Sequence, residues 1–408
     1  MKILVLNSGS SSVKFEIIET SLEAIENNTE QKLGHGLVDK IGIPGSLIRF
    51  SAPGKEVYEK QFDIPNHTAA LDEVLRTLVD PEHGVLKSLS ELEAVGHRVV
   101  HGAEHFAQSV IIDDKVAELI KRDCFSLAPL HVPANYKGYE VLKKALPASV
   151  PHVAVFDTAF HQTMPKHSYL YAIPYKYYEE NKIRRYGFHG SSHRYCLATL
   201  EKVFAKKPAA DFNAITVHLG NGCSLCAIEK GKSVDTSMGL TPLEGVIMGT
   251  RSGNVDTAAI LTIMENTGMT ANEASNMLNK KSGLLGISGV SNDMRDMDAA
   301  AAQGNERAKI AIKMFSYRVR KYIGAYMAVL GKVDYIAFAG GIGENNPPMR
   351  ASILEGLESM GIILDPSKND GCRKTAVISA DNSPITVCVI NTDEEIIIAR
   401  DTVRCIQK

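Results

Sequence analysis

Small residues and nearby cations recur in the sequence in a pattern that suits phosphate binding. Asn7–Ser12 is a turn of small and hydroxyl-bearing residues with Lys14 just beyond it, and Gly220–Gly222 and Gly340–Gly343 are two further glycine-rich turns. Small residues let backbone N–H groups approach a phosphate, and hydroxyls or a lysine add donors. Each turn alone could be an ordinary connection, and none continues into the Gly-Lys-Ser/Thr of a Walker motif. Together, the three turns predict a site for a nucleoside triphosphate.

Arginines in two further segments could bind a carboxylate or phosphate. Arg98 follows the apolar run at Val95, where a charged side chain needs a partner, and Arg251 lies in a polar segment rich in small residues. A guanidinium presents a fork that matches a carboxylate or a phosphate. An internal salt bridge is the alternative for either arginine.

Two histidine pairs have the spacing of possible zinc ligands on a helix. His101 and His105 are four residues apart, as are His189 and His193. Both spacers are rich in glycine or serine rather than in helix formers, and neither first histidine is followed by the acid of the H-E-x-x-H motif. We therefore do not expect a zinc site at either pair.

Two acidic side chains stand at the ends of predicted elements. Asp157 ends the apolar run 153–156, and the ends of buried strands are where α/β proteins place their chemistry. Glu394 opens the last helical pattern of the chain, where an acid can also simply stabilise the first turn of a helix.

The elements that must position these residues follow a repeated pattern. An apolar strand at 3–6, a turn, and an alternating strand at 13–18 have a counterpart 212 residues later, with strands at 215–219 and 224–228. Two buried hairpins could resemble each other by chance. The offset is close to half the chain, however, and so favours two related α/β halves with a cleft between them.

Further sequence patterns predict additional strands, helices and loops in both halves. A buried strand at 333–338 runs into the third glycine-rich turn, and a helix is expected to begin near Met349. Apolar periodicity predicts helices over 256–265 and 308–330. The polar segment 26–32 is expected to be a loop between strands.

Composition limits the classes of protein to consider. The 408 residues suit two domains, and 45 basic against 47 acidic residues give a net charge of −2, so no field favours nucleic acid or an anionic membrane. No apolar run reaches the ~18 residues of a membrane span, and the N-terminus lacks the pattern of a secretory signal. Seven scattered cysteines fit reduced thiols in the cytoplasm. Of these, Cys223 and Cys226 would point to opposite faces of one strand.

Nine segments, in this order and over nearly the whole chain, resemble those of acetate kinases. They are Asn7–Phe15 (NSGSSSVKF), Gly96–Gly102 (GHRVVHG), Leu127–Pro133 (LAPLHVP), Phe156–Pro165 (FDTAFHQTMP), Arg185–His193 (RYGFHGSSH), His218–Gly222 (HLGNG), Thr250–Asp256 (TRSGNVD), Gly340–Asn345 (GGIGEN) and Thr392–Glu395 (TDEE).

The resemblance implies a fold and a reaction. The fold would be α/β, with two ribonuclease-H-like domains of the actin, sugar-kinase and chaperone-ATPase superfamily around a nucleotide cleft. The domains would span 1–160 plus 394–408, and 161–393. The reaction would be reversible phosphoryl transfer between ATP and acetate, giving ADP and acetyl phosphate, with Mg²⁺ or Mn²⁺ as its alternative, in a cytoplasmic homodimer.

The resemblance also implies binding roles for individual residues. Arg98 would hold the substrate carboxylate, with Val100 and His131 lining the acyl site. Asn7 and Glu394 would form the metal site. The residues expected to bind ATP are Lys14, His218, Leu219, Gly220, Asn221, Gly222, Asp293, Met294, Arg295, Gly340, Gly341, Ile342, Gly343 and Glu344.

Three residues carry implied catalytic roles, with His189 and Arg251 stabilising the transition state and Asp157 moving a proton. A carboxylate nucleophile with a pKa near that of glutamate, ~4.3, is already ionised at pH 7 and needs no base. We therefore expect Asp157 to serve the metal or to position a water or a side chain. Catalysis should rest on positioning and charge neutralisation in a direct in-line transfer.

Four positions depart from the family pattern. Val132 stands where asparagine is usual, Ala103 for glycine, Asn292 for serine and Ala339 for threonine. Val132 lies beside the acyl site, so a propionate or butyrate kinase is the alternative. The moderate bulk of Val100 favours a two-carbon acid, although one methylene is worth only ~1–3 kcal/mol. A nucleotide-switched binding module on the same fold is a more distant alternative.

Overall fold

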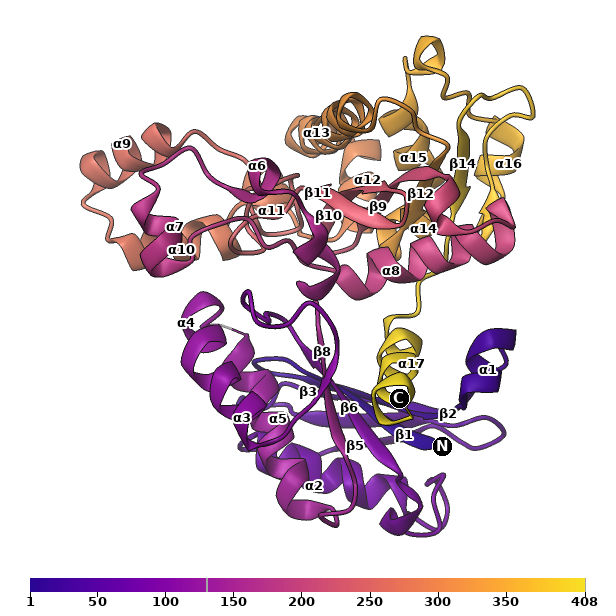
Figure 1. Ribbon diagram of the computed structural model, residues 1–408. Coiled ribbons are helices and arrows are strands. Elements are labelled where there is room, and N and C mark those ends of the chain that lie inside the picture. Colours follow the sequence, from indigo (N-terminus) through magenta and orange to yellow (C-terminus); the bar gives the residue numbers. More distant parts are fainter. Residues whose placement is uncertain (130, 408) are drawn as a thin grey trace. The chain divides into compact units, whose positions relative to one another are not determined.

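The computed structural model describes residues 1–129 and 131–407 (Figure 1). The chain forms two compact units, one of Met1–Ala159 with Asp393–Lys408 and one of Phe160–Thr392. Leu130, which belongs to the segment Leu127–Pro133, and the last residue, Lys408, lie outside the described residues. Each unit contains its own β-sheet, so the predicted mixed α/β class is confirmed.

The sheet of the first unit combines antiparallel hairpins with parallel strands. β1 pairs antiparallel with β2 and parallel with β6, and β6 pairs parallel with β8. The order across the sheet is β5 (Tyr58–Gln61), β4 (Leu47–Ser51), β3 (Gln31–Asp39), β2 (Val13–Glu19), β1 (Lys2–Ser8), β6 (Ala94–Val99), β8 (His152–Phe156) and β7 (Val110–Ile111).

Alternation along β1 explains the layers on this sheet. Leu4 and Leu6 pack in a core with residues of α2 (His67–Leu78) and α5 (Val132–Ala145). Ile3 packs in a second core with residues of α17 (Glu394–Ile406). Successive side chains of a strand point to opposite faces, so both faces of β1 are covered. The other helices of this unit are α1 (Leu22–Asn27), α3 (Asp114–Leu119) and α4 (Phe125–Leu127).

The second sheet repeats this topology. β9 pairs antiparallel with β10 and parallel with β12, just as β1 pairs with β2 and β6. The repeat predicted from two hairpins therefore extends across both sheets. The order is β11 (Lys232–Thr236), β10 (Cys223–Glu229), β9 (Asn213–Leu219), β12 (Tyr335–Ala339), β14 (Thr386–Val389) and β13 (Ala376–Val377).

Helices α8 and α13 pack against the second sheet. The predicted helices at 256–265 and 308–330 correspond to α9 and α13. The helices of this unit are α6 (Lys166–Tyr169), α7 (Lys176–Asn181), α8 (Gly190–Thr199), α9 (Thr257–Thr267), α10 (Ala271–Lys280), α11 (Gly283–Ser288), α12 (Met294–Ala302), α13 (Glu306–Leu330), α14 (Gly340–Asn345), α15 (Pro347–Leu354) and α16 (Pro366–Asp370).

Two local predictions were only partly right. The segment 26–32 is a loop only over residues 28–30, because α1 runs to Asn27 and β3 begins at Gln31. The helix expected near Met349 is α15, which begins at Pro347, but the third glycine-rich turn before it is itself a helix, α14, which begins at Gly340. Gly340 has φ of +74°, so its left-handed backbone makes the sharp exit from β12 that a glycine tolerates at no steric cost.

No helix within residues 1–129 and 131–407 combines the length and the apolar character that crossing a lipid bilayer requires.

Candidate active site

Arg98 and Asp157 pair at the ends of two parallel strands in the first unit. Arg98 Nε donates to Asp157 Oδ1 at 2.9 Å, and its Nη2 donates to Oδ2 at 2.7 Å. Asp157, which follows β8, is almost fully buried. Burial alone would lower the pKa of Arg98, but Asp157 and Glu394 outweigh it and raise that pKa. The carboxylate of Asp157 therefore has both oxygens held by one guanidinium.

Glu394 joins this pair from the first turn of α17. Its Oε2 lies 4.0 Å from Arg98 Nε. A Cβ at Gly96 would lie 2.5 Å from Thr402 Oγ1 and 2.7 Å from Ile398 Cγ2, so a glycine lets α17 approach β6. Burial is the largest cause that raises the pKa of Glu394, and Arg98 opposes it. The close packing of α17 thus brings the Glu394 carboxylate to Arg98.

The turn that follows Asn7 is fixed by a hydrogen bond within it and by another from His67. Asn7 pairs with Lys14 across the hairpin, and Gly9 N donates to Ser12 O at 2.7 Å. His67 Nε2 is hydrogen-bonded to Gly9 O at 2.7 Å. Asn7 and Lys14 therefore stand beside an ordered turn at the end of β1.

Val100 and His131 come from different elements of the same unit. Val100 follows β6, and His131 is the N-cap residue of α5. Asn135, on α5, accepts from Val100 N at 3.0 Å and donates from Nδ2 to Ser8 O at 2.5 Å. One buried amide thus ties Val100 to the end of β1.

His189 and Arg251 converge on a glycine in the second unit. A Cβ at Gly222 would lie 3.2 Å from His189 Nε2 and 3.3 Å from Arg251 Nη2. His189 is the N-cap residue of α8 and has φ of +57°, which a residue other than glycine rarely adopts and which concentrates at functional sites. Its spacing to His193 is helical after all, despite the glycine and serines between them.

Arg251 is a cation without an acidic partner among the described residues. Its Nη1 donates to the carbonyl of Pro242 at 2.7 Å, and no carboxylate in the described part of the chain pairs with it. Burial lowers the pKa of its guanidinium. A half-buried cation of this kind is suited to receive an anion.

Polar residues behind His189 form a hydrogen-bonded chain. His189 Nδ1 is bonded to Ser224 Oγ at 2.8 Å, and Ser224 Oγ to His193 Nε2 at 2.9 Å. His193 Nδ1 is bonded in turn to Thr216 Oγ1 at 2.7 Å. Nearby, His218 Nδ1 is bonded to Ser192 Oγ at 2.7 Å. These hydrogen bonds join the histidines and hydroxyls into a polar network.

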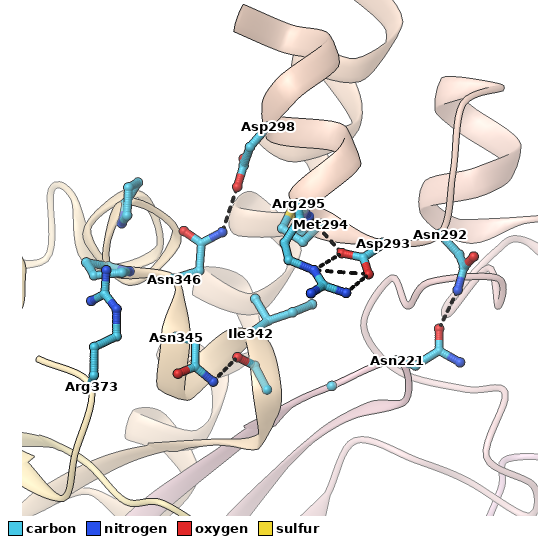
Figure 2. Close-up of a pocket in the computed structure, with 14 residues that line it drawn as sticks. Asn221, Asn292, Asp293, Met294, Arg295, Asp298, Ile342, Asn345, Asn346 and Arg373 are labelled. Carbon is cyan, nitrogen blue, oxygen red and sulfur yellow. Dashed lines mark hydrogen bonds and ion pairs between the residues drawn. The ribbon is translucent and has the colours of Figure 1, made fainter. Parts of the chain in front are cut away.

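A pocket of about 580 Å³ opens between the ends of β9, α12 and α14 (Figure 2). Figure 2 shows Met294 and Ile342 among the residues that line it, together with Asp293 bonded to Arg295 and Asn221 bonded to Asn292. Its volume is in the range of small-molecule sites. The residues that line it are Gly220, Asn221, Asn292, Asp293, Met294, Arg295, Asp298, Gly341, Ile342, Asn345, Asn346, Pro347, Pro348 and Arg373.

The pocket contains seven of the residues predicted to bind ATP. They are Gly220, Asn221, Asp293, Met294, Arg295, Gly341 and Ile342. Asp293 caps α12, and its hydrogen bonds with Arg295 lower the pKa of its carboxyl to about 2. His218, Leu219, Gly222, Gly340, Gly343 and Glu344 do not line the pocket, and Lys14 belongs to the first unit.

The Glu344 carboxylate is hydrogen-bonded to donors of the protein itself. Its Oε1 accepts from Gly340 N at 3.0 Å, from Thr392 N at 3.1 Å and from Thr392 Oγ1 at 2.9 Å, while its Oε2 accepts from Asn391 Nδ2 at 2.9 Å. Ala339 provides no side-chain cap for α14, so Glu344 satisfies the first backbone N–H of this helix. Glu344 therefore positions α14 against the segment that follows β14.

Sequence reasoning missed several residues around these sites. Asp298, Asn345, Asn346 and Arg373 line the pocket, and Asn135 ties Val100 to β1. One usable signal was present. The buried strands β9 and β10 carry polar residues at every second position, Thr216 with His218 and Ser224 with the cysteine at 226, which marks one polar face.

Comparisons with known proteins match nearly the whole chain to one family. The model of the acetokinase family matches residues 2–400. An acetate kinase of Caldicellulosiruptor saccharolyticus is 51% identical over 410 residues, covering 100% of both chains. The crystal structure of Porphyromonas gingivalis acetate kinase matches with a TM-score of 0.93 and 46% identity over 99% of both chains. A propionate kinase structure from Francisella tularensis matches with a TM-score of 0.90 and 42% identity, also over 99% of both.

Proposed function

The chain belongs to the acetokinase family, and on that basis we propose that it transfers a phosphoryl group reversibly between ATP and acetate, giving ADP and acetyl phosphate. It is a phosphotransferase with a carboxyl group as acceptor. The observation that carries the proposal is the pair of arginines: Arg98 has an acidic partner, whereas Arg251 has none in the part of the chain that the structure describes.

Arg98 is the proposed anchor of the acyl substrate. A guanidinium has five N–H donors, and Asp157 takes only one from Nε and one from Nη2. The edge formed by Nη1 and the second Nη2 hydrogen can still bind a carboxylate through two parallel hydrogen bonds. Asp157 then fixes the orientation of Arg98, and its proposed role is positioning rather than proton transfer.

Arg251 and His189 are the proposed groups that stabilise the transferred phosphoryl group, Arg251 by its charge and His189 by a hydrogen bond. An acetate anion must approach a phosphate that is itself negative, so the barrier is electrostatic. Among the described residues, Arg251 has no carboxylate to release before it binds the phosphoryl oxygens. The Nε2 atom of His189 lies near Gly222, the same glycine that the Arg251 guanidinium approaches.

The metal of this family is proposed to be Mg²⁺, with Mn²⁺ as a substitute, at Asn7 and Glu394. Mg²⁺ is usually bound by one or two carboxylates together with substrate phosphates and water. Glu394 provides one carboxylate, and no group of three or more histidine, cysteine and acidic residues in the described chain could hold an ion alone. These residues fit an ion that arrives with its nucleotide. When bound, the ion would neutralise phosphate charge.

The pocket of the second unit is the proposed nucleotide site. Met294 and Ile342 offer apolar contact for a base, and the turn at Gly220 offers backbone N–H groups. Glu344 is proposed to hold α14 in place rather than to contact ATP, because both of its oxygens already accept from protein donors.

The direct test is the product. Purified protein with Mg²⁺, ATP and acetate, in the presence of hydroxylamine, should give acetohydroxamate, the trapped form of the acyl phosphate. A protein that hydrolyses ATP without forming hydroxamate would be a nucleotide-switched module, and the proposal would fail.

Propionate is the second candidate substrate, because a propionate kinase is among the similar structures. We expect a higher kcat/KM with acetate than with propionate, and a still lower one with butyrate, since Val100 narrows the acyl site. Each added methylene should lower kcat/KM about tenfold. A higher kcat/KM with propionate would reassign the substrate.

A cytoplasmic homodimer is proposed as the working form. None of the residues of α9 is buried, and Leu261 and Ile263 are exposed on it, so this apolar helix suits contact with a second copy. All seven cysteines are free thiols, which suits a reducing compartment. The domains are proposed to span 1–160 plus 394–408, and 161–393.

A further inference from the structure

The chain of hydroxyls and imidazoles behind His189 can be read for the positions of its protons. It runs from Thr216 through His193 and Ser224 to His189, with successive distances of 2.7, 2.9 and 2.8 Å. Thr216, His193 and Ser224 are all fully buried, so bulk water cannot supply a missing partner. Each hydroxyl has one proton to donate, and a neutral imidazole has one N–H.

The direction of the chain is set at Thr216. The Thr216 hydroxyl has no other side-chain or backbone acceptor among the described residues, so its proton is satisfied only if it donates to His193 Nδ1. His193 must then have its proton on Nε2, which donates to Ser224 Oγ. Ser224 is left to donate its own proton to His189 Nδ1.

The reverse direction leaves a buried donor unsatisfied. If His189 Nδ1 had a proton and donated to Ser224, then Ser224 would donate to His193 Nε2, and His193 Nδ1–H to Thr216. The Thr216 hydroxyl proton would then point at no acceptor, which is costly inside a protein. A doubly protonated His193 has the same defect, and burial lowers the pKa of this imidazole well below its ordinary value.

We propose that Thr216, His193 and Ser224 are positioning residues that hold His189 as the neutral tautomer with its proton on Nε2. Nε2 is the atom beside Gly222 and the Arg251 guanidinium. His189 thus acts as a neutral N–H donor, and Arg251 supplies the positive charge. The catalytic consequence rests on the proposed function, whereas the tautomer itself does not.

The tautomer can be read directly by nuclear magnetic resonance of the full chain labelled with ¹⁵N-histidine and free of nucleotide. The signals of His189 are identified by their loss in His189→Gln. We expect a protonated Nε2 and an unprotonated, hydrogen-bonded Nδ1 at His189. In Ser224→Ala, a second population with the proton on Nδ1 should appear. A wild-type His189 with its proton on Nδ1, or no change in Ser224→Ala, would overturn the inference.

Variants of Thr216, at the far end of the hydrogen-bonded chain, test whether this hydroxyl determines the tautomer of His189. Thr216→Val removes the hydroxyl that sets the direction and should increase the Nδ1-protonated population, whereas Thr216→Ser should keep the wild-type tautomer. Thr236→Val is the matched control, because it removes a different buried hydroxyl, which donates to Leu225 O at 2.9 Å. A tautomer that responds equally to Thr216→Val and Thr236→Val would contradict a specific chain.

Kinetics separate this inference from the proposed function. If both hold, Ser224→Ala should lower kcat about tenfold, with little change in the acetate KM. This is less than the roughly 10²–10³-fold fall in kcat that loss of a whole hydrogen-bond donor causes. A changed tautomer with unchanged kcat would leave the proton chain in place and remove His189 from the proposed mechanism.

Discussion

Asp157 binds Arg98 through both carboxylate oxygens, at 2.9 Å from Nε and 2.7 Å from Nη2, in a nearly buried ion pair. Because each carboxylate oxygen accepts a hydrogen bond from the same guanidinium, the pair favours a positioning role for Asp157 over an obligatory proton transfer. The geometry also leaves the outer edge of the guanidinium available for a substrate carboxylate.

The first prediction concerns the two partners of this pair. Arg98→Ala should raise the acetate KM strongly with a smaller effect on kcat, because it removes the anchor of the acid. Asp157→Asn should also raise the acetate KM by about tenfold through misorientation of Arg98. Initial rates over a range of acetate concentrations check both. A large fall in kcat with unchanged KM in Asp157→Asn would restore a proton-transfer role.

A second prediction concerns the stability of the same pair. Asp157→Ala leaves a mostly buried guanidinium without its main partner and should lower the free energy of unfolding by about 3 kcal/mol. The same change in an Arg98→Met background should cost much less, because no charge is left unpaired. Urea unfolding of the four proteins gives the coupling energy, and a coupling near zero would show that the pair is not formed in solution.

The third prediction concerns Gly222, where an added Cβ would lie 3.2 Å from His189 Nε2 and 3.3 Å from Arg251 Nη2. Gly222→Ala should push these side chains apart by a few tenths of an ångström and lower kcat about tenfold. Gly371→Ala is a suitable control, because a Cβ there meets no atom within 4 Å. Equal kcat values for the two variants would show that the spacing at Gly222 is not critical.

A fourth prediction follows from Glu16, whose pKa burial raises to about 7 while Lys32 opposes the shift. Between pH 4.5 and 7 the folded state binds this proton and the unfolded state does not, so ionisation destabilises the fold as pH rises. Wild type should therefore lose stability relative to Glu16→Gln between pH 5.5 and 8, by about 1 kcal/mol after allowance for solvent screening. Urea unfolding at both pH values checks the sign. A gain in relative stability at pH 8 would contradict it.

Much of the fold could be predicted because its signals are local. Apolar strands and short turns identified both hairpins, and helical periodicity identified α9 and α13. Helix α14 was not predicted because its own sequence, GGIGEN, is rich in glycine and is typical of a turn, whereas Gly340 and the carboxylate of Glu344 start a helix there. Local composition does not show a cap contributed by tertiary structure.

The site was only partly predictable for the same reason. Motifs pointed to Arg98, His189 and Arg251, but the difference between the two arginines depends on Asp157, which lies 59 residues from Arg98 in the chain. The left-handed backbone of His189 likewise depends on its place at the start of α8. Partners brought together by folding decide what each motif residue can do.

We propose that Arg251, a half-buried cation without an acidic partner among the described residues, neutralises the phosphoryl group during transfer. The most direct measurement is the kcat and acetate KM of Arg251→Ala, with and without added guanidinium chloride below denaturing concentrations. We predict that kcat falls roughly 10²–10³-fold, that the acetate KM changes little, and that free guanidinium restores part of kcat. An unchanged kcat, or a loss confined to the acetate KM, would contradict the account.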